Sequence, residues 1–208
     1  MKRLIPLLLV LVLLLAGCGN GLHTFEGAEN GYVDIDSDRC YVMLDMAYES
    51  KAYSNEYGVY ENEAYQSTKS FFEIPKMDPT LYLTDAYGNV YYAGDVPIDA
   101  SEWELSMILF CQEEMISIEE FRFAASDAAK TVQRLRDLWF EGERAEMPLA
   151  AAKNVYAVKL MTADLANVCY GLQFFAYEDG NAYLCDKQRD RAVQLPADLA
   201  AAILAKGG

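Results

Sequence analysis

Histidine-dependent catalysis is the first chemistry that the sequence argues against. His23 is the only histidine among the 208 residues, and it lies in a glycine-rich stretch without an apolar period. General-base catalysis needs an imidazole held in fixed geometry, which a flexible stretch does not provide. Walker A, dinucleotide-binding and CxxC motifs are absent from the sequence. We therefore expect neither Ser-His-Asp nor Cys-His catalysis, no histidine-rich zinc or copper site, and no cofactor.

One group of aspartates has a spacing that resembles a metal-binding loop. Asp34, Asp36, Asp38 and Asp45 fall at positions 1, 3, 5 and 12 of an EF-hand-like calcium loop. Position 6 is Arg39 where the sharp turn requires glycine, and position 12 is aspartate instead of a bidentate glutamate. Both flanks also look like strands and not helices. We therefore interpret the group as an acidic hairpin turn and expect no metal.

Carboxylate pairs could hydrolyse a glycoside without histidine. The adjacent pairs Glu113-Glu114 and Glu119-Glu120 are examples, but the chain holds 32 acidic residues, so the choice of any pair is arbitrary. Such pairs are typical of solvated surfaces. The abundance of acidic residues allows enzymatic activity, but no motif supports it.

A group of tyrosines is the best candidate for a binding surface. The stretch 49–70 is rich in Tyr, Glu, Asn and Ser without a clean period, which predicts a long loop. Its candidate binding residues are Tyr53, Tyr57, Tyr60 and Tyr65. Amphipathic rings at this density suit a sugar or a protein partner. The alternative is that the rings pack back on the sheet.

The first residues resemble the signal peptide of bacterial lipoproteins. Lys2 and Arg3 precede an apolar run, Leu4–Leu15, and Leu15-Ala16-Gly17-Cys18 matches a lipobox. Twelve residues make a helix of roughly 18 Å, too short for a bilayer core of roughly 30 Å. A plain signal peptide with an unrelated cysteine is the alternative.

This resemblance implies a cellular location for the protein. Signal peptidase II would cut between Gly17 and Cys18, and the thiol of Cys18 would carry diacylglycerol. The protein would then be anchored at the extracytoplasmic face of the cell membrane, with residues 1–17 removed and 18–31 forming a flexible tether. The formal charge of the chain is −15, which disfavours nucleic acid as a partner.

The remaining chain predicts an α+β fold with an antiparallel sheet built of hairpins. The expected strands are Tyr32–Ile35, Cys40–Met46, Phe71–Ile74, Leu81–Thr84, Val90–Ala93, Ile116–Ala124, Asn154–Met161, Val168–Tyr177, Ala182–Cys185 and Ala192–Leu195. Trp103–Cys111 fits a helix or a strand, and a capping box at Ser101 favours the helix. The folded domain is expected at 32–208, or as two small modules of about 32–112 and 113–208.

Two further helices have clearer patterns. The long amphipathic helix Asp127–Glu141 places Val132, Leu135 and Trp139 on one face, with Ser126 as its expected N-cap. Pro196 precedes a short C-terminal helix, Ala197–Ala205. The second half of the chain resembles, in pattern only, the small α+β modules of uncharacterised lipoproteins from Gram-positive bacteria.

The cysteines other than Cys18 raise the question of disulfides. They are Cys40, Cys111, Cys169 and Cys185. The Asp-Gly turn at 179–180 predicts a two-residue hairpin loop, in which Cys185 faces Phe174 while Cys169 lies on the opposite face. A Cys169–Cys185 disulfide is then disfavoured unless the loop is longer, and buried free cysteines are the preferred interpretation.

Two classes of function follow. A non-catalytic envelope lipoprotein that binds a protein, a peptide or a wall polymer is favoured, because the motifs that the sequence lacks are mainly those of enzymes. A carboxylate-based hydrolase acting on cell-wall polysaccharide is the alternative.

Overall fold

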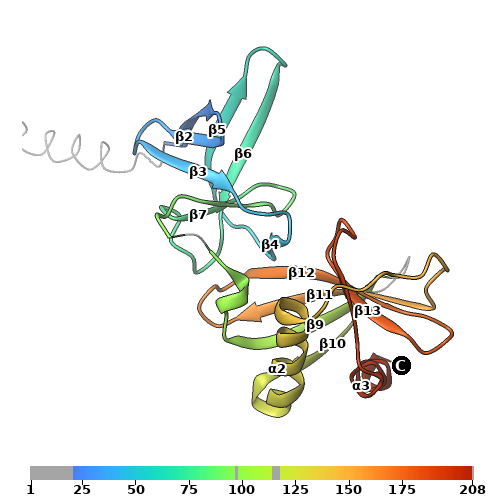
Figure 1. Cartoon of the computed structure of the whole chain (residues 1–208). Coiled ribbons are helices and arrows are strands. Elements are labelled where there is room, and N and C mark those ends of the chain that lie inside the picture. The colour runs from blue at the N-terminus through green and yellow to red at the C-terminus, as the bar shows by residue number, and fades with distance from the viewer. Residues whose placement is uncertain (1–20, 97, 114–117, 208) are drawn as a thin grey trace, which may run out of the picture.

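The first half of the chain forms a closed β-barrel, drawn in blue to green in Figure 1. The computed structural model describes residues 21–96, 98–113 and 118–207. Neighbouring strands of the barrel follow the order β1-β2-β3-β8-β7-β6-β5 and are antiparallel, except that β1 and β5 pair in parallel and close it. The strands are β1 (His23–Ala28), β2 (Gly31–Asp34), β3 (Arg39–Met43), β5 (Glu56–Asn62), β6 (Ser67–Glu73), β7 (Tyr82–Thr84) and β8 (Val90–Tyr92).

Gly58 permits this closure. A Cβ atom there would lie 2.5 Å from the carbonyl oxygen of His23 and 2.6 Å from the ring of Phe25, so no side chain fits. The pairing of β5 with β6 shifts register between Glu56 and Gly58, as at a β-bulge. The shift explains how Tyr57 and Tyr60, three positions apart, both pack against the barrel core.

Two segments that the sequence predicted to be irregular are strands. The predicted tether, 18–31, contains β1, and the predicted loop, 49–70, contains β5 and part of β6. The fold therefore begins by His23, before the predicted start at Tyr32. Only Phe25 is buried in β1 and only Gly58 in β5, so neither strand shows the alternation of large apolar residues that marks a half-buried strand.

The second half of the chain forms a seven-stranded antiparallel sheet with two helices on one face (Figure 1). The strand order is β10-β9-β11-β12-β13-β14, and β4 also pairs with β12. Alternate residues of β11, Tyr156, Val158 and Leu160, pack under the helices. The elements are β4 (Tyr48–Ser50), β9 (Leu105–Glu113), β10 (Ile118–Ala124), α2 (Ala125–Glu141), β11 (Asn154–Thr162), β12 (Val168–Ala176), β13 (Ala182–Cys185), β14 (Ala192–Gln194) and α3 (Ala197–Gly207).

The predicted α+β class is confirmed, but the predicted arrangement of a single antiparallel sheet was too simple. A barrel and a sheet replace one sheet of hairpins, because the parallel β1–β5 pairing brings together strands that are distant in sequence. The chain passes from the barrel to the sheet between β8 and β9, where the short 3-10 helix η1 (Ala100–Glu102) lies. β4 joins the sheets, because it pairs with β12 and the amide of its Ser50 donates to the carbonyl of Gly88 in the turn between β7 and β8.

The predicted amphipathic helix is roughly matched by α2, in which the backbone is non-helical at Ala128 (φ −140°, ψ 40°) and the helix is kinked. Val132, Leu135 and Trp139 are its buried residues. Ser126 is not the N-cap, because the helix begins at Ala125, two residues before the predicted start, and Ala124 takes the cap position without a side-chain hydrogen bond. The short C-terminal helix is confirmed, as α3.

The segment Trp103–Cys111 is mainly strand, and the preference for helix was wrong. β9 pairs with β10 on one side and β11 on the other, and its residues Ile108 and Phe110 face the helices. Asp99, not Ser101, caps the preceding turn by accepting from the amide of Ser101. The partly buried residues Met107 and Leu109, which alternate with Ile108 and Phe110, are also apolar. The sequence therefore shows a continuous apolar run, which local spacing does not distinguish from a buried helix.

The predicted hairpin of β12 and β13 forms with a register one residue different. The amide of Tyr177 donates to the carbonyl of Asn181, so the loop has three residues and Cys185 faces Gln173. Cys169 is then on the same face, but four positions from Gln173, or about 13 Å along the strand, beyond disulfide reach. The four cysteines in the described part of the chain are free; Cys40 is exposed and the other three are buried.

Candidate functional site

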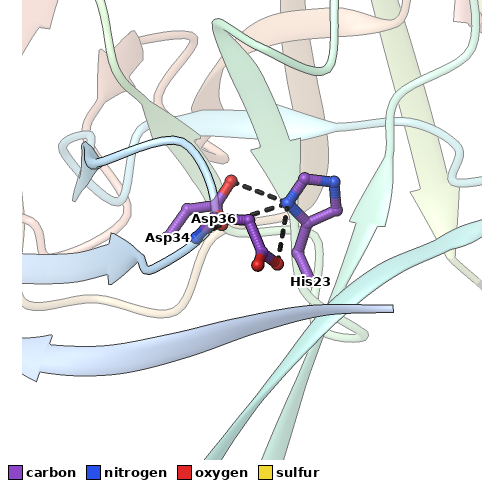
Figure 2. Close-up of side chains that lie close together, drawn as sticks. All are labelled: His23, Asp34 and Asp36. Carbon is purple, nitrogen blue, oxygen red and sulfur yellow. Dashed lines mark hydrogen bonds and ion pairs between the residues drawn. The ribbon is translucent and has the colours of Figure 1, made fainter. Parts of the chain in front are cut away.

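A histidine and two aspartates meet at one end of the barrel (Figure 2). The Nδ1 atom of His23 lies 3.0 Å from Oδ1 and 2.9 Å from Oδ2 of Asp34. The same nitrogen lies 3.7 Å from Oδ2 of Asp36. Because an ionised carboxylate only accepts hydrogen bonds, Nδ1 carries the proton in this arrangement. The second ring nitrogen makes no contact within the group.

The turn between β2 and β3 fixes the two carboxylates. Asp34 ends β2, and its side chain accepts from the amide of Asp36 at 3.0 Å and from the Oγ of Ser37 at 2.6 Å. The amide of Asp38 donates to the carbonyl of Asp34, and Asp38 takes a positive φ of 56°. An aspartate that caps its own turn in this way is common in hairpins.

The structure brings together only part of the predicted aspartate group. Asp34 and Asp36 meet at His23, whereas Asp38 and Asp45 are not members of that cluster. Asp45 instead accepts from the amide of Ala47 beside β4. The hairpin-turn interpretation therefore describes the fold of this segment, and no EF-hand loop forms because strands flank it.

The imidazole of His23 is held in place, contrary to the expectation of a flexible tether. Its ring stacks on Tyr57, with the ring centroids 4.2 Å apart and the planes inclined by 12°. Tyr57 comes from β5, the strand that pairs in parallel with β1. Sequence reasoning missed this contact because it depends on a long-range strand pairing that no local pattern indicates.

Asp34 is a buried charge, since its side chain has no exposed surface. Burial alone would raise its pKa, but hydrogen bonds from Ser37, His23 and the amide of Asp36 together hold the pKa of this carboxyl below its ordinary value. The carboxylate is therefore ionised at neutral pH.

A second buried carboxylate, Asp85, lies in the turn between β7 and β8, and its partner is a lysine, whereas that of Asp34 is a histidine. The Nζ of Lys69 is 3.1 Å from its Oδ2, and the Oη of Tyr91 also donates to that oxygen. Burial opposes ionisation of Asp85, but Asn89 and Lys69 hold its pKa below the ordinary value. Burial raises the pKa of Tyr91 to about 12. The hydroxyl therefore stays protonated and able to donate.

A hollow of about 390 Å³ opens at the opposite end of β1 and β2 from His23. Lys69 reaches it with its Nζ 5.3 Å from the ring centroid of Tyr32 and 4.8 Å from that of Tyr91. The side chains and glycines that line the hollow include Asn30, Gly31, Tyr32, Tyr60, Asn62 and Lys69. Aromatic faces, two amides and a neutralised lysine thus surround one space.

The four predicted binding tyrosines do not share a surface. Tyr57 faces His23, and Tyr60 lines the hollow and contacts Tyr32. Tyr53 is 55% exposed and packs on Phe72, while Tyr65 is 81% exposed in the turn of the β5–β6 hairpin. Sequence reasoning missed Lys69, Asp85 and the asparagines of the hollow. Only the Asp85–Asn89 turn carried a local signal, that of an Asx-turn.

The other predicted residues are not part of either group described above. Leu15, Ala16, Gly17 and Cys18 lie outside the described residues, as does Glu114. Glu119 and Glu120 are exposed on β10, where Glu120 accepts from the Sγ of Cys111 at 3.6 Å. Among the described helices, none has the length and apolar character needed to cross a bilayer.

Comparisons with protein-family models, with curated proteins and with solved structures found no match to this chain. Its function must therefore be argued from the two groups of residues at the ends of the barrel.

Proposed function

We propose that this chain is a lipid-anchored lipoprotein of the extracytoplasmic membrane face, and that its barrel is a non-catalytic module which binds a wall polymer. The anchor rests on the lipobox that ends in Cys18. The binding role rests on one observation, the hollow lined by Tyr32, Tyr60 and Lys69.

Saccharides suit the chemistry of this hollow. Tyr32 and Tyr60 bring aromatic rings to the hollow, and Asn30 and Asn62 bring amides that can donate to and accept from hydroxyl groups. Lys69 is already paired with Asp85, so it offers little free charge to an anion. The formal charge of −15 also disfavours a polyanion. An uncharged stretch of wall polysaccharide therefore fits better than a phosphate-rich polymer.

The binding site is tested with the full-length protein in detergent and purified wall fragments. Tyr60→Ser removes a ring from the hollow and is expected to weaken co-sedimentation with the fragments at least about fivefold, since truncation of an important interface residue costs more than about 1 kcal/mol. Tyr65→Ser is the matched control on the same hairpin, and it should bind like the wild type. Circular dichroism checks that each variant is folded at the assay temperature.

Three outcomes would change this assignment. Retained binding by Tyr60→Ser would exclude the hollow, and loss in Tyr65→Ser would place the site on the outer surface. Release of reducing sugar from the fragments would favour the carboxylate-based hydrolase instead. The anchor is tested separately, because Cys18→Ala should abolish labelling by a palmitate analogue in cells, and continued labelling would exclude lipidation at this residue.

A further inference from the structure

The two buried carboxylates of the barrel differ in how their charge is balanced. Asp85 has Lys69 within ion-pair distance. Across the described residues, the ion pairs of Asp34 and Asp36 involve His23 and no lysine or arginine. A lysine is cationic at neutral pH, whereas an imidazole need not be charged. Two carboxylates and one imidazole therefore form a locally negative group with no fixed cation.

The spacing of the donor atoms fits a metal ion. One ligand atom from each of His23, Asp34 and Asp36 can be chosen so that all lie within 4.8 Å of one another, and Nδ1 is 2.9–3.7 Å from the carboxylate oxygens. Ligands about 2.0–2.2 Å from a zinc ion lie roughly 3.0–3.5 Å apart. Figure 2 shows Nδ1 directed at the carboxylates of both aspartates. An ion between them needs only small side-chain movements.

The surroundings suit a metal site in two further ways. The ring of His23 is oriented by its stacking on Tyr57, and Asp34 is oriented by the hydrogen bond from Ser37. Metal sites in proteins commonly use such supporting contacts to fix their ligands. The side chain of Asp36 is 62% exposed, so an ion can enter from solvent.

We propose that His23, Asp34 and Asp36 bind a divalent first-row transition ion of the zinc type. The ion takes the place of the proton on Nδ1, which is released to solvent, and water completes the coordination. One imidazole and two carboxylates suit zinc, whereas calcium prefers six to eight oxygen ligands and magnesium retains most of its water. The site is independent of the saccharide-binding hollow, which lies at the opposite end of β1.

Titration of the metal-free, full-length protein with zinc tests this site. The protein should carry no histidine tag, so that His23 is the only imidazole, and the ¹⁵N resonances of that ring are followed while calorimetry gives the affinity. We expect a large shift of Nδ1 at one equivalent of zinc. A hundredfold excess of calcium should not reverse it. Because a thiolate cannot shift the imidazole in this way, binding at Cys40 is distinguished from binding at His23.

Two charge-matched variants separate coordination from general attraction. Asp36→Asn removes an exposed ligand and should weaken zinc binding at His23 at least about tenfold, or roughly 1.4 kcal/mol. Asp38→Asn removes the same charge from the same turn outside the cluster, and asparagine tolerates the positive φ there. It should bind zinc like the wild type. Equal weakening in both variants, or an unshifted Nδ1 resonance in the wild type, would overturn the proposal.

Discussion

The barrel and the sheet bury different kinds of side chain. The sheet packs mainly aliphatic and aromatic residues of its strands against α2 and α3. The barrel has a much smaller core, in which four of five buried residues are aromatic, and it also buries Asp34 and Asp85. The five core residues are Phe25, Tyr41, Phe71, Leu83 and Tyr91.

This difference assigns stability and chemistry to different parts of the chain. Apolar packing stabilises without requiring particular partners, and the sheet depends on it. A buried carboxylate is tolerated only where specific groups compensate it, and the barrel provides these groups from distant strands. The candidate sites therefore lie in the barrel, and removal of a side chain should have consequences of different size and kind in the two regions.

The largest effect is expected in the sheet, at Trp139. Its side chain is 3% exposed and packs from α2 against the strands of the sheet. Trp139→Ala should lower the free energy of unfolding by about 3–5 kcal/mol, through lost burial and the cavity that remains. Urea denaturation followed by circular dichroism measures the change. A midpoint equal to that of the wild type would show that this face of α2 contributes no packing.

The next effect is expected in the barrel, at Asp85. Asp85→Ala leaves Lys69 without its partner and two backbone amides without their acceptor. Lys69 keeps some access to water, which limits the cost of leaving its charge unpaired. We therefore expect the free energy of unfolding to fall by about 2–4 kcal/mol, measured by the same denaturation experiment.

A matched control isolates the ion pair from the turn. Asp179 caps its hairpin turn as Asp85 does, accepting from the amide and the side chain of Asn181, but it is exposed and has no lysine. Asp179→Ala should therefore shift the midpoint much less than Asp85→Ala. Equal shifts would mean that turn capping, and not charge compensation, explains the role of Asp85.

The same contrast explains what could be predicted from sequence. The sheet half followed its periodicity, since the buried face of α2 and the strands β11 and β12 were predicted within a residue or two. Apolar residues that face one large core repeat at the period of their element. The error at β9 arose because the partly buried Met107 and Leu109 are apolar like the buried Ile108 and Phe110, so the sequence shows no period there.

Five strands of the barrel half, β2, β3, β6, β7 and β8, were predicted at least in part, but β1 and β5, which close the barrel, were not. β1 was interpreted as part of a tether and β5 as part of a loop, because a small barrel needs few large residues from each strand and uses Gly58 where strands approach closely. The candidate sites depend on these same strands. His23 was identified as the sole histidine, but its stacking on Tyr57 follows from the β1–β5 pairing, which no local pattern indicates. Its contact with Asp34 follows from the β1–β2 hairpin, which was missed because β1 was interpreted as part of a tether.

The smallest effect concerns acid, and it tests whether Asp34 stabilises the barrel as an anion. Burial opposes its ionisation, but hydrogen bonds from Ser37 and His23 hold the pKa of its carboxyl below the ordinary value, which is about 3.9 in an unfolded chain. Above that ordinary value the carboxyl is ionised in both states, and the stabilisation is fully present. As the pH falls below it, the unfolded chain takes up the proton first, so the stabilisation is lost progressively towards the folded pKa.

Asp34→Asn removes this titration and keeps an oxygen that can accept from the amide of Asp36. The difference in unfolding free energy between wild type and variant should therefore be constant near neutrality and shrink as the pH falls below about 4. Urea denaturation with a chelator present, repeated between about pH 7 and pH 2, measures it, and the difference cancels the titration shared by both proteins. Asp95→Asn, at an exposed position, controls for the change in net charge. A difference that stays constant through the acid range would mean that the charge on Asp34 does not stabilise the fold, and the barrel would then resemble the sheet in depending on packing alone.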